Sequence, residues 1–174
     1  MGITVEKEFI QANDLVRDSF ALARMIYDSG YRPEVVLVLW RGGTPVGVVV
    51  HEYLRYKGVE TYHAAVKAES YTGIEQRQEP VVEHLDAVLR GIPASARVLV
   101  IDDIFDTGCT IRKVLDLLAP RTTNVKIATL YLKEGKNLTG LAPDFVLRRT
   151  DRWIVFPHEL MGLTEAELRR KEVF

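Results

Sequence analysis

Three aspartates follow an apolar run in the stretch VLVIDDIFDTGCT, residues 98–110. The run Val98–Ile101 predicts a buried strand, and Asp102 and Asp103 come immediately after it. Neighbouring strand residues point to opposite faces, so the two carboxylates cannot share one apolar face, and burying either one unpaired would cost several kcal/mol. We therefore expect both at a solvated opening, where a sugar diol together with Mg²⁺ would suit carboxylate oxygens.

The next residues, Asp106-Thr107-Gly108-Cys109-Thr110, precede a predicted helix. Glycine allows a tight turn that exposes backbone N–H groups, and a helix N-terminus carries a partial positive charge. With two threonine hydroxyls, this turn has the features of a monophosphate-binding loop, although it lacks the Gly-Lys-Ser/Thr ending of a Walker A loop. The alternative is an ordinary helix N-cap, in which Asp106 or Thr107 caps the helix and the two preceding aspartates are merely solvated.

Arg41-Gly42-Gly43, at the end of a second apolar run, indicates another anion site. Two glycines let the backbone approach an anion, and Arg41 supplies positive charge. The glycine spacing does not fit the dinucleotide-binding pattern Gly-x-Gly-x-x-Gly. Taken alone, this turn is more simply interpreted as a plain strand-to-helix connection. Beside the first motif, at a neighbouring strand end, it predicts a second anion site.

These motifs require a scaffold that brings strand ends together, and the order of the predicted elements supplies one. The expected strands are 34–40, 59–70, 96–102, 125–133 and 144–149; the expected helices are 12–30 (capped by Asn13 or Asp14), 45–58 (opening at Pro45), 81–91 and 110–120; and 71–80 is expected to be a long exposed loop. Such alternation predicts an α/β fold with a mostly parallel central sheet flanked by helices. In these folds, ligands bind beyond the carboxyl ends of the strands.

Composition points to a single globular domain of 174 residues, with 47% hydrophobic and 27% charged residues. The formal charge of −1 gives no net attraction for nucleic acid or an anionic membrane. No apolar run reaches the ~18 residues needed to span a bilayer, and the first ten residues lack the pattern of a signal peptide. Cys109 is the sole cysteine, which excludes an intramolecular disulfide and fits a cytoplasmic protein.

Residues 98–110 resemble the phosphoribosyl pyrophosphate (PRPP) signature of the type I phosphoribosyltransferases: an apolar strand, two acids, two residues, then Asp-Thr-Gly-x-Thr. The resemblance implies that Asp102 and Asp103 contact the ribose hydroxyls and the metal, with Mg²⁺ as the cofactor. It also implies that residues 106–110 hold the 5′-phosphate of PRPP.

The Arg41–Gly43 turn is similar to the pyrophosphate loop of the same family. The similarity extends over roughly residues 34–160, and it implies the type I phosphoribosyltransferase fold. In that fold a core, here about residues 12–150, carries a small hood formed by the chain ends. We expect the N-terminal segment and residues 151–174 to form the hood, all within one phosphoribosyltransferase domain, 1–174.

The stretch DRWIVFPHE, residues 151–159, together with Lys133, resembles the 6-oxopurine branch of the family, especially its bacterial xanthine-guanine type. The resemblance implies that Lys133 donates to the purine O6, that Trp153 stacks on the ring, and that Ile154 reads the base edge through its backbone. Glu159 is implied as a third metal ligand beside the two aspartates. Without the resemblance, Lys133 would be a lysine at a strand exit and Trp153 a core aromatic.

Ser70 and Tyr71 resemble the start of the family's mobile lid, and Asp106 lies where the family has a carboxylate near purine N7, which implies a general base. The implied reaction converts hypoxanthine, guanine or xanthine and PRPP into the nucleoside 5′-monophosphate and pyrophosphate. The family also implies a homo-oligomer, a dimer or tetramer.

Three alternatives remain open. One is a PRPP-binding regulatory protein of the same fold; no added basic or helix-turn-helix segment supports it. Another is transfer to a different base, such as adenine, orotate or uracil, but a lysine donor at position 133 suits a 6-oxo acceptor rather than an amino group. A PRPP-synthesising kinase would need a second domain and an ATP motif, and the sequence has neither.

Overall fold

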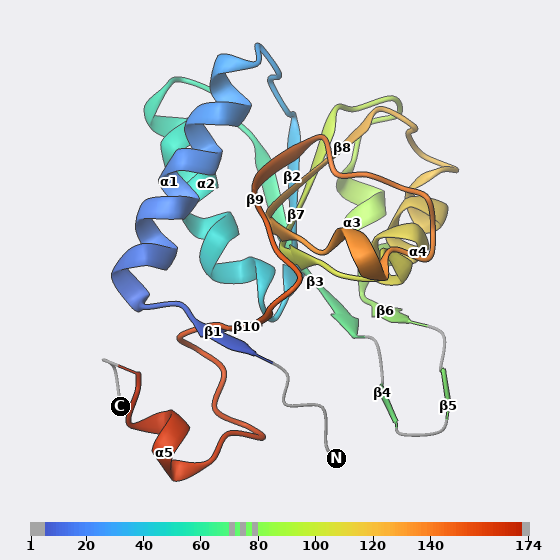
Figure 1. Cartoon of the computed structure of the whole chain (residues 1–174). Helices are drawn as coiled ribbons and strands as arrows, with labels where there is room; N and C mark the ends of the chain where they lie inside the picture. The colour runs from blue at the N-terminus through green and yellow to red at the C-terminus, as the bar shows by residue number, and fades with distance from the viewer. Residues whose placement is uncertain (1–5, 70–71, 74–75, 78–79, 172–174) are drawn as a thin grey trace.

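The computed structural model describes residues 6–69, 72–73, 76–77 and 80–171 (Figure 1). Its elements, in chain order, are β1 (Lys7–Phe9), α1 (Ala12–Asp28), β2 (Val35–Trp40), α2 (Gly43–Tyr56), β3 (Tyr62–Glu69), β4 (Thr72–Gly73), β5 (Gln76–Arg77), β6 (Val81–Glu83), α3 (Leu85–Gly91), β7 (Val98–Phe105), α4 (Cys109–Leu118), β8 (Val125–Leu132), the 3-10 helix η1 (Glu134–Lys136), β9 (Phe145–Arg149), β10 (Trp153–Val155) and α5 (Glu165–Leu168). None of the helices in these ranges has the length and apolarity needed to cross a bilayer.

Within the described residues, six strands form the central sheet in the order β6-β3-β2-β7-β8-β9. Each neighbouring pair is parallel except β3 and β6, which pair antiparallel. β7 lies between β2 and β8, with Ile101 opposite Val38 on one side and opposite Ala128 on the other. The expected α/β fold, with a mostly parallel central sheet flanked by helices, is confirmed.

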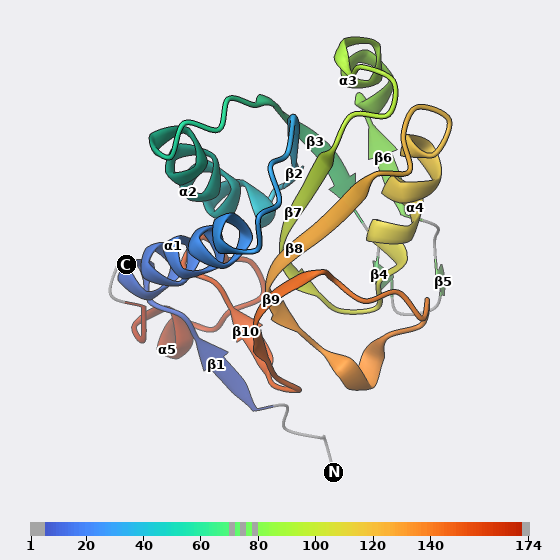
Figure 2. The same cartoon turned by 90° about the horizontal axis from the view of Figure 1, so that it is seen from above.

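The side chains of β7 alternate between the two faces of the sheet. Leu99 and Ile101 pack in one hydrophobic cluster with α1 and α2, whereas Val98 and Val100 pack in a second cluster with α3 and α4. All four side chains are fully buried. This is the pattern of a strand covered on both faces, which reads as a continuous apolar run. Figure 2 shows α1 and α2 on one side of the sheet and α3 and α4 on the other.

β7 is longer than predicted, because it continues past Ile101 to Phe105. Its pairing with β8 accounts for the extra length: Asp102 lies opposite Thr129, and Phe105 lies opposite Leu132. The expected strand end, at Ile101 or Asp102, was therefore too early. Both acids belong to the strand itself.

The predicted helix over 81–91 is divided into a short strand and a helix. β6 extends the sheet at the edge of β3, with Val81 opposite Glu69. His84 then takes a left-handed conformation, with φ 67°, which a continuous helix could not accommodate. The described parts of the expected loop 71–80 also contain a small antiparallel pair, β4 and β5, with Thr72 opposite Arg77.

Two helix starts differ from the prediction. α1 is preceded by Gln11 in the N-cap position, without a side-chain cap, so neither Asn13 nor Asp14 caps it. α2 begins at Gly43, two residues before Pro45. Proline is tolerated there because N–H groups in the first turn have no partner within the helix.

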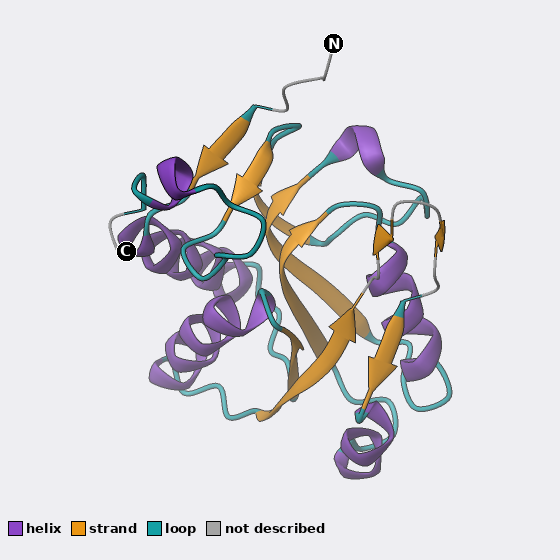
Figure 3. Ribbon diagram, turned by 90° about the horizontal axis from the view of Figure 1, so that it is seen from below, coloured by secondary structure: helices purple, strands orange, loops and turns teal. Residues whose placement is uncertain are grey.

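Outside the central sheet, β1 and β10 form a two-stranded parallel sheet, in which Lys7 lies opposite Trp153 and Phe9 opposite Val155. Figures 1 and 3 show this small sheet near α5 and beyond one end of the central strands. It joins segments that are far apart in the chain. It therefore places Trp153 at the edge where the aspartates of β7 lie.

Candidate active site

The Arg41–Gly43 turn lies directly against the acidic part of β7. A Cβ atom added to Gly42 would be 2.0 Å from Asp103 Oδ2, and one added to Gly43 would be 2.5 Å from the carbonyl oxygen of Ile101. Both distances are too short for any side chain to fit without displacement. The two glycines are therefore needed for close approach. The two segments that the sequence predicts to bind pyrophosphate and ribose are thus adjacent.

Asp102 and Asp103 are held in an environment that disfavours their charge. Asp103 is only 8% exposed, and its backbone N–H donates to Asp102 Oδ1 at 3.0 Å. Burial, followed by the charge of Asp103, raises the pKa of Asp102 well above its ordinary value. Burial also raises the pKa of Asp103 to about 6. Asp103 is therefore not freely solvated, and a bound cation or hydroxyl donor, as the sequence predicts for this pair, would relieve the cost of its charge.

Mg²⁺ would suit this pair of carboxylates, because it prefers hard oxygen ligands and keeps several waters. Over the described ranges, no group of three or more His, Cys, Asp or Glu side chains converges to hold a metal ion. The carboxylate of Glu159 turns back to accept the Phe156 N–H at 3.0 Å, although its charge still raises the pKa of Asp103. The structure therefore does not gather Glu159 with Asp102 and Asp103 into a three-carboxylate site.

His158, which the sequence motifs did not assign to the site, lies beside this acidic pair. Its Nε2 is 4.0 Å from Asp103 Oδ2, and its ring stacks on that of Phe156, with centroids 5.6 Å apart and planes 9° from parallel. Burial lowers the pKa of His158, and the charge of Glu159 opposes that shift. The only signal in the sequence was its position one residue before a predicted ligand.

The predicted phosphate loop depends on Gly108. Its φ of 80° lies in the left-handed region, and an added Cβ would be 2.4 Å from Thr139 Oγ1 and 2.7 Å from Phe105 Cζ. Glycine alone avoids both the strained conformation and the collisions. Gly108 therefore allows the turn to pack closely against Phe105 at the end of β7 before α4 begins.

The backbone around α4 also excludes the ordinary N-cap interpretation. Gly108, not Asp106 or Thr107, occupies the N-cap position, and α4 has no side-chain cap. Thr107 Oγ1 accepts the N–H of Cys109 at 3.3 Å, which stabilises the turn. Cys109 and Thr110 form the first helical residues. The loop therefore leads directly into the N-terminus of α4, whose partial positive charge favours a bound anion.

A cluster of opposite charges and an aromatic ring lies next to this loop. Lys133 is 4% exposed, and its Nζ is 3.6 Å from Asp106 Oδ2 and 5.1 Å from the centroid of Trp153. Lys136, which the motifs missed, adds a second ammonium 4.0 Å from Asp106 Oδ2 and 5.8 Å from the same ring. It follows Lys133 by three residues in η1, one turn of a 3-10 helix. The residues predicted to meet the base are therefore together.

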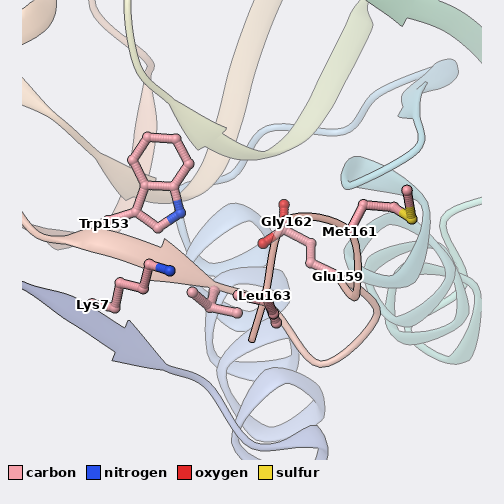
Figure 4. A pocket seen from close by; sticks show the side chains of 7 residues that line it. Lys7, Trp153, Glu159, Met161, Gly162 and Leu163 are labelled. Atoms are coloured by element: carbon pink, nitrogen blue, oxygen red, sulfur yellow. The ribbon is translucent and has the colours of Figure 1, made fainter. Parts of the chain in front are cut away.

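A cavity of about 180 Å³ lies beside Trp153 (Figure 4). Trp153 stands on one side of it, and Glu159 and Met161 approach from the segment that follows β10, with Lys7 below. Trp153 is 49% exposed, whereas Ile154 is 5% exposed and packs into the core. The side chain of Ile154 is thus unavailable to a ligand, which is compatible with the expected recognition through its backbone.

Ser70 and Tyr71, the predicted lid residues, lie outside the described residues. β3 ends at Glu69, immediately before them, and β4 follows at Thr72. Their predicted role stays a prediction.

Comparisons with known proteins agree with this arrangement. The model of the phosphoribosyl transferase domain matches residues 7–161, which is most of the chain. The chain is 25% identical over 149 residues to the hypoxanthine-guanine phosphoribosyltransferase of Lactococcus lactis, covering 81% of this chain and 75% of that protein. It is 28% identical over 162 residues to the xanthine-guanine phosphoribosyltransferase of Cereibacter sphaeroides, covering 89% of each.

The crystal structure of a purine phosphoribosyltransferase from Pyrococcus horikoshii superposes with a TM-score of 0.71 at 28% identity, over 91% of this chain and 98% of that one. Sequence motifs, site geometry and fold therefore agree, and the expected resemblance to the family and its 6-oxopurine branch is confirmed. The chain belongs to the phosphoribosyltransferase family.

Proposed function

We propose that this protein transfers the phosphoribosyl group of PRPP to a 6-oxopurine, namely hypoxanthine, guanine or xanthine. The observation that carries the proposal is the cluster of Lys133, Asp106 and Trp153 beside the phosphate loop. A buried ammonium is a donor for the 6-oxo group, an exposed indole face can stack on a purine, and a carboxylate lies between them and the sugar site. The names of the relatives from Lactococcus lactis and Cereibacter sphaeroides support the same class of base.

In the proposed reaction, the bond from C1′ of ribose to pyrophosphate breaks and a bond from C1′ to purine N9 forms. Asp102 and Asp103 would hold the ribose hydroxyls and Mg²⁺, whose charge offsets that of the departing pyrophosphate. The Arg41 guanidinium and the amides of the Gly42–Gly43 turn would stabilise the same leaving group. The 5′-phosphate would remain fixed at the N-terminus of α4 throughout.

Asp106 would accept the proton that the purine releases when N9 bonds to C1′. Its Oδ1 is buried and has no hydrogen-bond partner among the described residues, while its Oδ2 faces Lys133 and Lys136. One oxygen of the Asp106 carboxylate is therefore available to hydrogen-bond with a base. This pattern supports the general-base role of Asp106.

A screen of hypoxanthine, guanine, xanthine, adenine and uracil with PRPP and Mg²⁺, following pyrophosphate release, tests the proposal. Turnover is expected with at least one of the three 6-oxopurines and little with the other two bases. Turnover with adenine or uracil alone would assign the chain to another base. PRPP binding without turnover on any base would favour the regulatory alternative.

A further inference from the structure

Lys171 is a buried lysine that the proposed reaction does not use. It lies just after α5, and it is only 4% exposed. Its Nζ donates to the carbonyl oxygen of Phe156 at 2.5 Å and to that of Pro157 at 3.1 Å. Lysine is almost never fully buried unless its charge has partners. The partners here are two backbone carbonyls, so the ammonium holds a particular stretch of backbone.

That stretch connects the two halves of the site. It follows β10, which carries Trp153, and it precedes His158 and Glu159. The Phe156 carbonyl that Lys171 contacts also accepts the N–H of Glu159 at 3.1 Å. The ammonium of Lys171 therefore binds the same carbonyl that closes the turn 156–159. This turn carries Glu159 toward the cavity and His158 toward the acidic pair.

The segment that carries Lys171 is itself fixed to the small sheet. Thr164 and Glu167 form a capping box at the start of α5, and Glu167 also binds Lys7 of β1 at 2.6 Å. Because Lys7 lies opposite Trp153 in the β1–β10 pair, residues 164–171 are tied to this sheet at two points, Glu167 and Lys171. One tie reaches β1, and the other reaches the turn after β10.

An ammonium suits this position better than a neutral donor. The carbonyl oxygens of Phe156 and Pro157 both accept from it. Pro157 has no N–H, so it cannot donate to a nearby carbonyl. Charge-assisted hydrogen bonds are roughly twice as strong as neutral ones. Burial lowers the pKa of Lys171, and the charge of Glu159 opposes that shift. The carboxylate of Glu159 thus helps to keep the lysine charged.

We infer that Lys171 is a positioning residue for the base-binding half of the site. It touches no substrate. It fixes the turn 156–159, and through that turn it sets the placement of Trp153 and Glu159 around the cavity. This inference rests on the proposed function for its kinetic consequence, because Trp153 is the residue proposed to stack on the purine.

The test compares Lys171→Met, which keeps the length of the side chain but removes its charge and donors, with Arg169→Met. Arg169 lies on the same segment but is exposed, and it pairs with the exposed Glu165 at 3.5 Å. For Lys171→Met, we expect the KM for the purine to rise about tenfold, the loss anticipated for one charged hydrogen bond, while the KM for PRPP changes less than about twofold. Arg169→Met should leave both constants unchanged.

Rescue distinguishes positioning from a general loss of packing. In Lys171→Ala, added butylammonium should restore the KM for the purine, and butanol, of similar size but uncharged, should not. If Lys171→Met does not fold, Lys171→Gln carries the same kinetic expectation. An unchanged purine KM in a folded variant would overturn the inference. So would a parallel rise in both KM values, or equal rescue by butanol.

A second readout does not depend on turnover. In a Trp40→Phe background, Trp153 is the sole tryptophan. Acrylamide quenching of its fluorescence should increase in Lys171→Met and stay at the background value in Arg169→Met. If the unaltered protein turned over no 6-oxopurine, the proposed function would fail, whereas this measurement would still decide the placement of Trp153. Equal quenching in both variants would refute it.

Discussion

Replacing Gly42 by alanine would insert one methyl group between the Arg41–Gly43 turn and the carboxylate of Asp103. The added Cβ would lie 2.0 Å from Asp103 Oδ2, and ordinary contacts begin at 3.4 Å, so the carboxylate must retreat by about 1.4 Å. The backbone at Gly42, with φ −65° and ψ −37°, already suits any residue. The three atoms nearest the added Cβ all belong to the carboxylate of Asp103, so the perturbation falls first on that side chain.

Displacing a reacting or binding group by about 1 Å can lower a rate about 100-fold. For Gly42→Ala, we therefore expect kcat/KM for PRPP to fall by about two orders of magnitude. The free energy of unfolding should change little, because the colliding atoms are the far end of a side chain. Pyrophosphate release gives the kinetic constants, and thermal denaturation monitored by circular dichroism gives Tm.

Gly47→Ala is the matched control, because it adds the same methyl group within α2, away from the Arg41–Gly43 turn. Its Cβ would lie 1.9 Å from Cγ1 of Val38, a partly buried side chain that packs against the core. Overpacking of this kind costs about 1–3 kcal/mol, or several degrees of Tm, and the kinetic constants should stay within about threefold. If Gly42→Ala kept the PRPP kinetics of the unaltered enzyme, Asp103 would not hold the sugar or its metal where the fold places it.

Three further results are expected. Burial raises the pKa of Asp103 to about 6, above its ordinary value, so protonation of this carboxyl stabilises the folded state at low pH, and that stability is lost as the pH rises through 6. In EDTA, Asp103→Asn should therefore raise Tm at pH 8 more than at pH 4.5. Equal increases in Tm at the two pH values would contradict this expectation. Asp18→Ala removes a carboxylate that accepts two 3.0 Å hydrogen bonds from Arg148. Because Arg148 is half-exposed, we expect the free energy of unfolding, measured in urea, to fall by about 1–2 kcal/mol. An unchanged free energy of unfolding would mean that the pair does not stabilise the fold. Lys133→Ala should raise the KM for the purine, and an unchanged KM would contradict the role of Lys133 in base binding. Asp106→Asn should lower kcat and leave PRPP binding, measured by calorimetry, intact. Loss of PRPP binding in Asp106→Asn would contradict the general-base role of Asp106.

Local patterns in the sequence were sufficient to predict the central part of the fold. β7 reads as a continuous apolar run because both faces are covered, and the turn at Gly108 reads as a phosphate loop because glycine is required there. The strand end was misplaced because Asp102 and Asp103 look like loop residues by type. Their place in the strand depends on pairing with β8.

Residues that act across long sequence distances were beyond prediction. The burial of Asp103 depends on the Gly42 turn and on His158, which come from distant parts of the chain. Lys171 reads as one more charge in the polar run LRRKE, and its role emerges only when its ammonium meets the carbonyl of Phe156. Lys136 had a local signal, the three-residue spacing from Lys133. That signal has no meaning until the turn is known to be a 3-10 helix.

The parallel pairing of β1 with β10 has a consequence for the order in which the molecule assembles. Residues 7–9 leave the ribosome early, but their partner, 153–155, emerges only after the entire central sheet has been synthesised. Contacts of such long sequence separation carry a large loop-closure entropy, so they form late, once the intervening chain is compact. The cavity beside Trp153 should thus be the last part of the molecule to form. Because the same few contacts hold it, its amides should also be among the first to exchange with solvent.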